Sequence, residues 1–114
     1  ILDLSMEAFI NNDRAKAGDV EPLEQVIDEM KENMRTSHVL RMRNGECSME
    51  MGFVWSDILT NFERVSDHCS NIAGCVIDAA EHNLNLHETL GNFKHNSKAF
   101  GERYKYYSEK YSKI

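Results

Sequence analysis

The chain has 114 residues, which is enough for one domain with a hydrophobic core and too few for two substantial ones. Nineteen acidic and thirteen basic residues give a formal net charge of -6, which disfavours a nucleic-acid partner and favours cations or basic protein surfaces. No stretch approaches the roughly 20 apolar residues of a membrane span, so we expect no direct membrane insertion of this segment.

The cysteines and the first residue bear on the cellular setting. Cys47, Cys69 and Cys75 show no C-x-x-C spacing, so neither a disulfide framework nor a cysteine zinc site is predicted. A reducing, cytoplasmic setting fits this pattern best. The chain begins with Ile1 rather than Met, which leaves open that it is a piece of a longer protein.

Helices are predicted throughout, because the chain has one proline and six glycines and its apolar residues recur at steps of three and four. A first, short helix is expected over 3–16, with Gly18 ending it. A second is expected to begin at Pro22, because the missing N–H of proline has no intrahelical partner at a first helical position. Asn44-Gly45 supplies a left-handed stop at its end, and its predicted buried stripe is Leu23, Ile27, Met30 and Met34.

The third helix is expected over 47–82, a length of roughly 50 Å. Its predicted apolar stripe keeps a three- and four-residue spacing and comprises Met51, Ile58, Phe62, Val65, Cys69, Ile72, Val76 and Ala79. Such a pattern is typical of a long helix packed lengthwise in a bundle.

A polar segment over 83–95 separates these helices from a last one, expected over 97–113. Phe100, Tyr104, Tyr107 and Tyr111 recur at three- and four-residue steps and should dock this helix on the bundle. The predicted fold is all-α: an elongated antiparallel three-helix bundle over 1–83, with a polar connection and an additional C-terminal helix over 84–114.

Two E-x-x-x-D pairs, Glu24/Asp28 and Glu63/Asp67, are the most informative motif. Acidic pairs four residues apart recur elsewhere in this chain, so spacing alone is weak evidence. Counted from Gly45, Asp28 lies 17 residues before the turn and Glu63 18 after it. Glu24 lies 21 residues before it and Asp67 22 after it. In an antiparallel hairpin the four carboxylates therefore share one level, and their helical angles place them on one outer face.

Carboxylates gathered in this way repel one another, by about 4 kcal/mol for unit charges roughly 4 Å apart near a protein surface. A hard multivalent cation bound by carboxylate oxygens would reverse the sign of that interaction. One reading is therefore a metal site formed by Glu24, Asp28, Glu63 and Asp67. An equally weighted reading is a solvated acidic face, helped by Arg64 nearby.

Other chemistry-bearing motifs are weaker. His68 and Asn71 could add metal ligands beside Asp67, but structural hydrogen bonding is the favoured role for each. None of the five histidines has an acidic residue three positions before it in the sequence. The E-x-x-H motif of di-iron bundle proteins is therefore absent, and di-iron chemistry is not predicted. No phosphate loop, dinucleotide fingerprint or nucleophile elbow occurs. We therefore predict no catalytic or cofactor-binding residues, and no enzyme.

The sequence NFERVSDHCSNIAGCVIDAA, over 61–80, resembles the PhoU family, whose helical repeats carry a run of the form leucine-E-R-x-x-D-H-x-x-N-I-A. The sequence VEPLEQVIDEM, over 20–30, resembles the first motif of the same repeat, and AFINNDRAKA, over 8–17, the end of the family's first helix. The run HVLRMRNGEC, over 38–47, followed by DHCSNIA, is similar in particular to the PhoU-like domain of bacterial sodium/phosphate cotransporters.

This resemblance implies a single three-helix PhoU repeat that takes part in phosphate transport or its regulation and does no chemistry. It also implies metal binding by E-x-x-x-D motifs in some members, which carries over to Glu24, Asp28, Glu63 and Asp67. PhoU proper has two repeats and this chain shows one. A metal cluster could therefore be absent here, or could form only across a homodimer.

The leading hypothesis is a cytoplasmic PhoU-like regulatory domain of a sodium/phosphate cotransporter in the plasma membrane. Its expected partners are the membrane portion of the same protein or a phosphate-signalling protein. The alternatives are a carboxylate module that binds iron, zinc or manganese, and a stand-alone phosphate-signalling protein.

Overall fold

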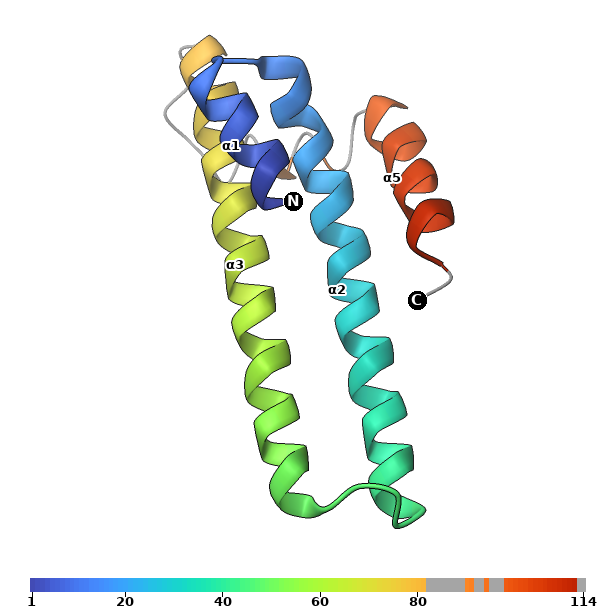
Figure 1. The fold of residues 1–114 in the computed structure, drawn as a ribbon. Coiled ribbons are helices and arrows are strands. Elements are labelled where there is room, and N and C mark those ends of the chain that lie inside the picture. Colours follow the sequence, from blue (N-terminus) through green and yellow to red (C-terminus); the bar gives the residue numbers. More distant parts are fainter. Residues whose placement is uncertain (82–89, 92–93, 95–97, 113–114) are drawn as a thin grey trace.

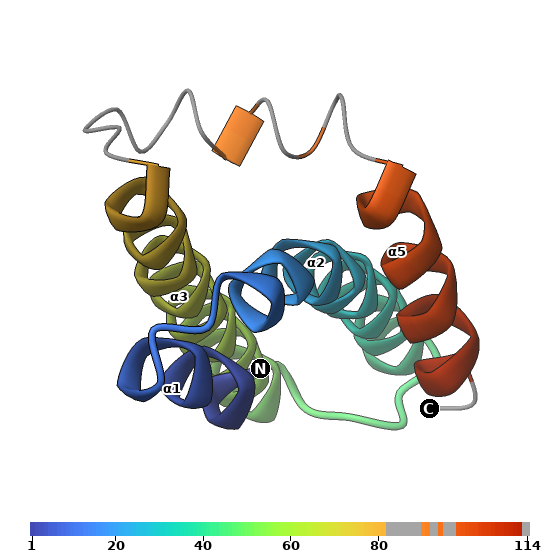
Figure 2. The same ribbon diagram turned by 90° about the horizontal axis from the view of Figure 1, so that it is seen from above.

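The computed structural model describes residues 1–81, 90–91, 94 and 98–112. Its helices are α1 (Leu2–Ile10), α2 (Arg14–Arg43), α3 (Met49–Glu81) and α5 (Lys98–Tyr111). Helices α2 and α3 form a long antiparallel hairpin (Figure 1). Seen from above, α1 lies beside this hairpin and α5 packs on the other side of α2 (Figure 2). The predicted all-α, elongated bundle is confirmed, with extents of 53 × 24 × 23 Å.

The start of α2 differs from the prediction of a first helix over 3–16 and a second from Pro22. Helix α1 ends at Ile10, and Asn12 takes a left-handed conformation with φ 48°. Asp13 then caps α2, because its carboxylate accepts a hydrogen bond of 3.1 Å from the backbone N–H of Lys16. Asparagine tolerates positive φ better than most residues, so the turn falls at Asn12 rather than at Gly18.

Gly18 and Pro22 therefore lie inside α2, against the prediction that they end one helix and begin the next. Both residues are buried. Without an N–H, Pro22 cannot donate to the Gly18 carbonyl, which normally disfavours proline in a helix interior. Packing of Ala17 and Val20 in the core offsets this local cost.

The turn between α2 and α3 follows the predicted left-handed stop. Gly45 has φ +75°, and the backbone N–H of Glu46 donates to the Arg41 carbonyl at 2.9 Å. Helix α3 begins at Met49 rather than at Cys47, after a turn in which the Ser48 hydroxyl accepts from a backbone N–H. The predicted end of this helix at His82 lies outside the described residues, as does most of the polar segment over 83–95.

Two apolar clusters hold the helices together. The first joins α1, α2 and α3 and is built from small side chains: Ala8, Ala17, Val20, Cys69, Ala73, Val76 and Ile77. The second joins α2 to α5 and consists of Leu23, Val26 and Tyr107, with Tyr104 and Tyr111 packed against it. The predicted docking of the last helix through its tyrosine face is confirmed.

The predicted buried stripe of α3 is mostly wrong. Of its eight residues Cys69 and Val76 are buried and Ile72 is half-buried, whereas the other five are exposed: Met51, Ile58, Phe62, Val65 and Ala79. A series of residues seven apart is buried instead: Gly52, Leu59, Ser66 and Ala73. Gly52 lies so close to Met42 and His38 of α2 that an added Cβ would meet the Met42 Sδ atom at 2.5 Å. The hairpin therefore packs through small side chains and Leu59 of α3, and most of the larger apolar side chains in its first half are exposed.

The stripe predicted on α2 is mostly right, because Leu23 is buried and Ile27, Met30 and Met34 are half-buried. Of the helices in the described part of the chain, none has the length and apolar character needed to cross a membrane.

Candidate functional site

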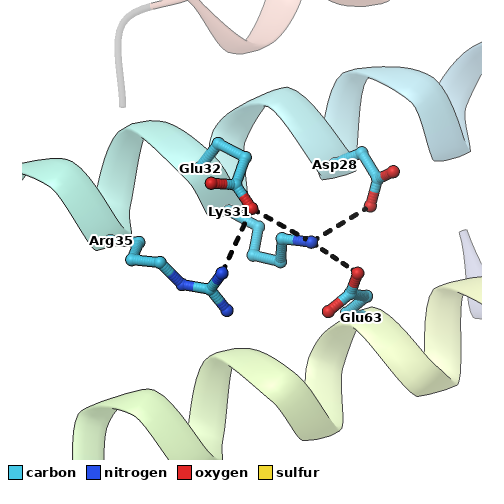
Figure 3. Close-up of polar contacts among 5 residues, drawn as sticks. All are labelled: Asp28, Lys31, Glu32, Arg35 and Glu63. Carbon is cyan, nitrogen blue, oxygen red and sulfur yellow. Dashed lines mark hydrogen bonds and ion pairs between the residues drawn. The ribbon is translucent and has the colours of Figure 1, made fainter.

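The acidic residues singled out in the sequence lie on α2 and α3, and one lysine lies among them. The ammonium of Lys31 contacts Asp28 at 3.8 Å and Glu32 at 3.3 Å, and it donates a short hydrogen bond to Glu63 of α3 (Figure 3). The Lys31 side chain is only 12% exposed. The ammonium of this largely covered lysine thus lies among carboxylates from both helices.

The contacts of Lys31 stabilise its charged form. The pKa of Lys31 is raised above its usual value, mainly by the hydrogen bond to Glu63. Burial lowers this pKa, and Glu32 and Asp28 raise it further. Arg35 extends the network, because its guanidinium lies 3.4 Å from Glu32. This Lys31 network, comprising Asp28, Lys31, Glu32, Arg35 and Glu63, links the two long helices near the middle of the hairpin.

Sequence reasoning missed Lys31 and named Arg64 as the neutralising residue. Lys31 follows Asp28 by three residues, a spacing that brings side chains together on a helix and was readable in the sequence. Its partner Glu63 is 32 residues away, and that contact depends on how the two helices pack.

Glu24 occupies a different environment, although it lies one helical turn before Asp28. Its side chain is buried, with 7% of the residue exposed. Burial is the main cause that raises the pKa of Glu24 to about 7, and the neighbouring carboxylates of Glu21, Asp28 and Asp67 raise it further. Lys94 acts in the opposite direction. Glu24 therefore holds its proton far above the usual pH range of a glutamate.

Glu21 lies beside Glu24 and bridges α2 to α3. It is 8% exposed and accepts a short hydrogen bond from the buried Ser70 hydroxyl. The Lys94 ammonium lies 4.0 Å from the Glu21 carboxylate. This second polar contact between the long helices was not predicted, because neither residue belongs to the E-x-x-x-D pairs.

The remaining predicted residues lie at the surface of α3. Asp67 is exposed, and it is close enough to Glu24 to affect its pKa. His68 and Asn71 are also exposed. The four predicted carboxylates thus fall into two sets, with Asp28 and Glu63 joined by Lys31, and Glu24 buried near Asp67.

This arrangement bears on the metal prediction. Within the residues that the structure describes, no three His, Cys, Asp or Glu side chains are grouped so that they could hold a metal ion. The Lys31 ammonium lies where a cation between Asp28 and Glu63 would have to bind. As arranged, the four carboxylates do not fit a metal ion, and metal binding by them stays a prediction.

The fold and the site together define an elongated helical-bundle domain whose two long helices are joined by a lysine–glutamate ion pair and by a buried serine–glutamate hydrogen bond. Residues 1–76, which include α1, α2 and most of α3, match the model of the PhoU domain. The chain belongs to the PhoU domain family. Helix α5 lies outside the matched residues.

A curated relative supports the family. The chain is 36% identical over 73 residues to the phosphate-specific transport system accessory protein PhoU homolog 1 of Thermotoga maritima. The alignment covers 64% of this chain and 32% of the relative, so the chain spans about a third of that protein's length. No solved structure matches the chain significantly.

Proposed function

We propose that this chain is a non-enzymatic regulatory domain of phosphate transport. The observation that carries the proposal is the PhoU domain match over residues 1–76. The curated relative, by its name an accessory protein of a phosphate-specific transport system, supports the same process. In this role the domain acts by protein contact, and the ion pair of Lys31 with Glu63 and the hydrogen bond of Ser70 to Glu21 join α2 to α3.

We further propose that the domain is the cytoplasmic part of a sodium/phosphate cotransporter and binds the membrane portion of that protein. The sequence run over 38–47, followed by DHCSNIA, supports this assignment through its similarity to such domains. The net charge of -6 also supports it, because the cytoplasmic loops of membrane proteins carry an excess of lysine and arginine. A separate phosphate-signalling protein is the alternative partner.

The test is phosphate uptake by cells of the source organism with the codons for residues 1–114 deleted in frame from the chromosomal gene. We expect uptake to lose its response to external phosphate. Cells that carry Glu109→Gln, an exposed change on α5, serve as the matched control and should keep the response. An unchanged response in the deletion strain would contradict the proposed role.

Metal binding remains the alternative function, and we propose that it requires displacement of Lys31. Replacement of this lysine by methionine keeps its packed stem and removes the competing cation. We expect Lys31→Met to bind manganese or zinc at least roughly tenfold more tightly than the original chain, because the freed carboxylates repel one another. Isothermal titration with each metal measures this change.

The control for the metal experiment is Lys31→Met combined with Glu63→Ala and Asp67→Ala. This variant should lose the gained affinity while circular dichroism shows retained helicity. Equal metal affinity of Lys31→Met with and without the two alanine substitutions would remove Glu63 and Asp67 from the site.

A further inference from the structure

Helix α5 packs on α2 through a contact that has the composition of an interface between proteins. Within α5, which the structure describes in full, Tyr107 is the only buried residue. It lies in a cluster with Leu23 and Val26 of α2, and Tyr104 and Tyr111 pack against that cluster. Interfaces between separate proteins are enriched in tyrosine and arginine and concentrate their binding on a few buried anchors inside a polar rim. The contact of α5 with α2 has this pattern.

The rim of the contact pairs acidic residues of α2 with a basic and a phenolic side chain of α5. Arg103 lies 2.9 Å from Asp19, and the two side chains keep 37% and 28% of their surface exposed. The Tyr104 hydroxyl donates a hydrogen bond of 2.6 Å to Glu29. Polar contacts in such a rim select the partner more than they strengthen its binding.

Charge also distinguishes α5 from the helices beside it. Helix α5 carries four basic and two acidic residues, whereas residues 1–97 carry eight basic and seventeen acidic ones. Figure 2 shows α5 along α2, on the side away from α3. A basic helix therefore lies on one side of an acidic hairpin.

The surface under α5 belongs to the part of the chain that matches the PhoU domain. Its residues all lie within 1–76, and we call them the α2 face: Asp19, Leu23, Val26 and Glu29. Helix α5 begins at Lys98, outside the match. The chemistry that the α2 face accepts can be read from α5, as a helix with a tyrosine anchor and a cation four residues before it.

We propose that the α2 face binds a basic, tyrosine-bearing helix of a partner protein, and that α5 occupies this face as a competitor within the same chain. A helix that replaces α5 has to supply the same cation for Asp19 and the same aromatic anchor for Leu23 and Val26. A segment of the same chain competes at an effective concentration on the order of millimolar. The partner therefore binds tightly only when α5 leaves, and release of α5 opens the surface.

The source of the partner helix is the one step that rests on the proposed function. Cytoplasmic segments of membrane proteins carry an excess of lysine and arginine, which complements the acidic α2 face. The partner is accordingly a lysine- and arginine-rich cytoplasmic helix in the membrane portion of a phosphate transporter.

The surface is tested with a fluorescent peptide that has the sequence of residues 98–112, added to the 114-residue chain and followed by fluorescence anisotropy. We expect Tyr107→Ala in the chain to bind the peptide at least roughly tenfold more tightly than the original chain does, because its own α5 no longer occupies the α2 face. Tyr106→Ala is the matched control, at a tyrosine that is 47% exposed, and it should bind no better than the original chain.

A charge exchange shows whether the peptide binds at the α2 face. Added to the Tyr107→Ala chain, Asp19→Lys should weaken peptide binding at least roughly fivefold, and a peptide with Arg103→Glu should regain affinity for that chain. Asp57→Lys makes the same change at an exposed position of α3 and should leave the binding unchanged. Equal binding to the original and Tyr107→Ala chains, no binding to Tyr107→Ala, or equal effects of the two lysine substitutions would overturn the proposal.

The source of the partner is tested by photo-crosslinking in cells, with benzoylphenylalanine in place of Asn33. This exposed residue of α2 lines a groove together with Tyr111 of α5. The original chain should cross-link to its own α5, and Tyr107→Ala should cross-link to a lysine- and arginine-rich segment of a transporter's membrane portion. Cross-links to α5 alone, or to a protein without such a segment, would overturn this assignment. Phosphate uptake in the deletion strain tests the regulatory role separately, so the two failures can be told apart.

Discussion

At the scale of single residues, Glu24 makes the stability of the fold depend on pH. Its pKa of about 7 in the folded chain exceeds the ordinary glutamate value of 4.5. Below the ordinary value the group is protonated in both folded and unfolded chains. As the pH rises, the unfolded chain loses this proton first, so the folded chain loses stability until the pH exceeds about 7.

We therefore predict that Glu24→Gln is more stable than the original chain at pH 8, by on the order of 1 to 3 kcal/mol, and that the difference shrinks at pH 4. Urea unfolding at both pH values measures it. Glu109→Gln, at an exposed position, should show little difference from the original chain at either pH. A destabilised Glu24→Gln at pH 8 would show that the carboxylate is stabilised by contacts rather than strained by burial.

Gly45 carries the turn between the long helices through its backbone conformation. Its φ of +75° is disfavoured for a residue with a Cβ, and no atom lies within 4 Å of the position where one would be added. We predict that Gly45→Ala destabilises the chain by about 1 kcal/mol through backbone strain alone. Gly101→Ala, in the open interior of α5, should be neutral or stabilising because alanine favours helix. Thermal unfolding of the two variants separates these outcomes, and equal shifts would contradict the argument.

At the scale of elements, the helices and the stop at Gly45 could be predicted from local signals. The start of α2 could not, because buried packing around Pro22 overrides two residues that normally end or begin a helix. The boundary instead falls at Asn12, which tolerates positive φ, and at Asp13, which caps the next helix. The residue types alone therefore located the turn at Gly45. They misplaced the turn at Asn12, because Gly18 and Pro22 are buried inside α2 instead of ending and beginning helices.

The sides of the helices were harder to predict than their lengths. The three- and four-residue spacing identifies an apolar series on α3. It does not show which of those residues are covered by another helix. Phe62 and Cys69 occupy equivalent positions seven residues apart, and only Cys69 is covered. For the candidate site, the acidic pairs were placed on the correct helices, and Lys31 was missed because its contact with Glu63 arises from packing.

Tyr107 is the buried side chain in the contact of α5 with α2, and Arg103 and Tyr104 add polar contacts to Asp19 and Glu29 of α2. Tyr107 is 6% exposed and forms the second apolar cluster with Leu23 and Val26, and its hydroxyl accepts a hydrogen bond of 3.1 Å from Arg103. We predict that Tyr107→Ala costs about 3 to 5 kcal/mol of docking free energy, as for other large buried aromatics. Hydrogen exchange should then show α5 unprotected, with α1 to α3 still protected.

The control for that experiment is Tyr106→Ala, because Tyr106 is a neighbouring tyrosine that is 47% exposed. It should leave the protection of α5 nearly unchanged. Loss of protection throughout α2 and α3 in Tyr107→Ala would instead show that α5 is part of one cooperative unit with the hairpin.

At the scale of the whole molecule, burial is concentrated at one end of the hairpin. The buried residues of α2 lie over 17–26, apart from His38, and most of those of α3 lie over 66–78. Near the turn, the buried positions of α3 are Gly52 and Leu59. A region with few buried apolar contacts opens at a lower free energy than the rest of the fold.

We therefore predict that backbone amides over 34–58 exchange with solvent faster than those over 66–78. Hydrogen exchange with mass spectrometry resolves these segments. Equal rates at both ends of the hairpin would contradict the gradient, because they would mean that contacts near the turn stabilise α2 and α3 as strongly as the core beneath α1.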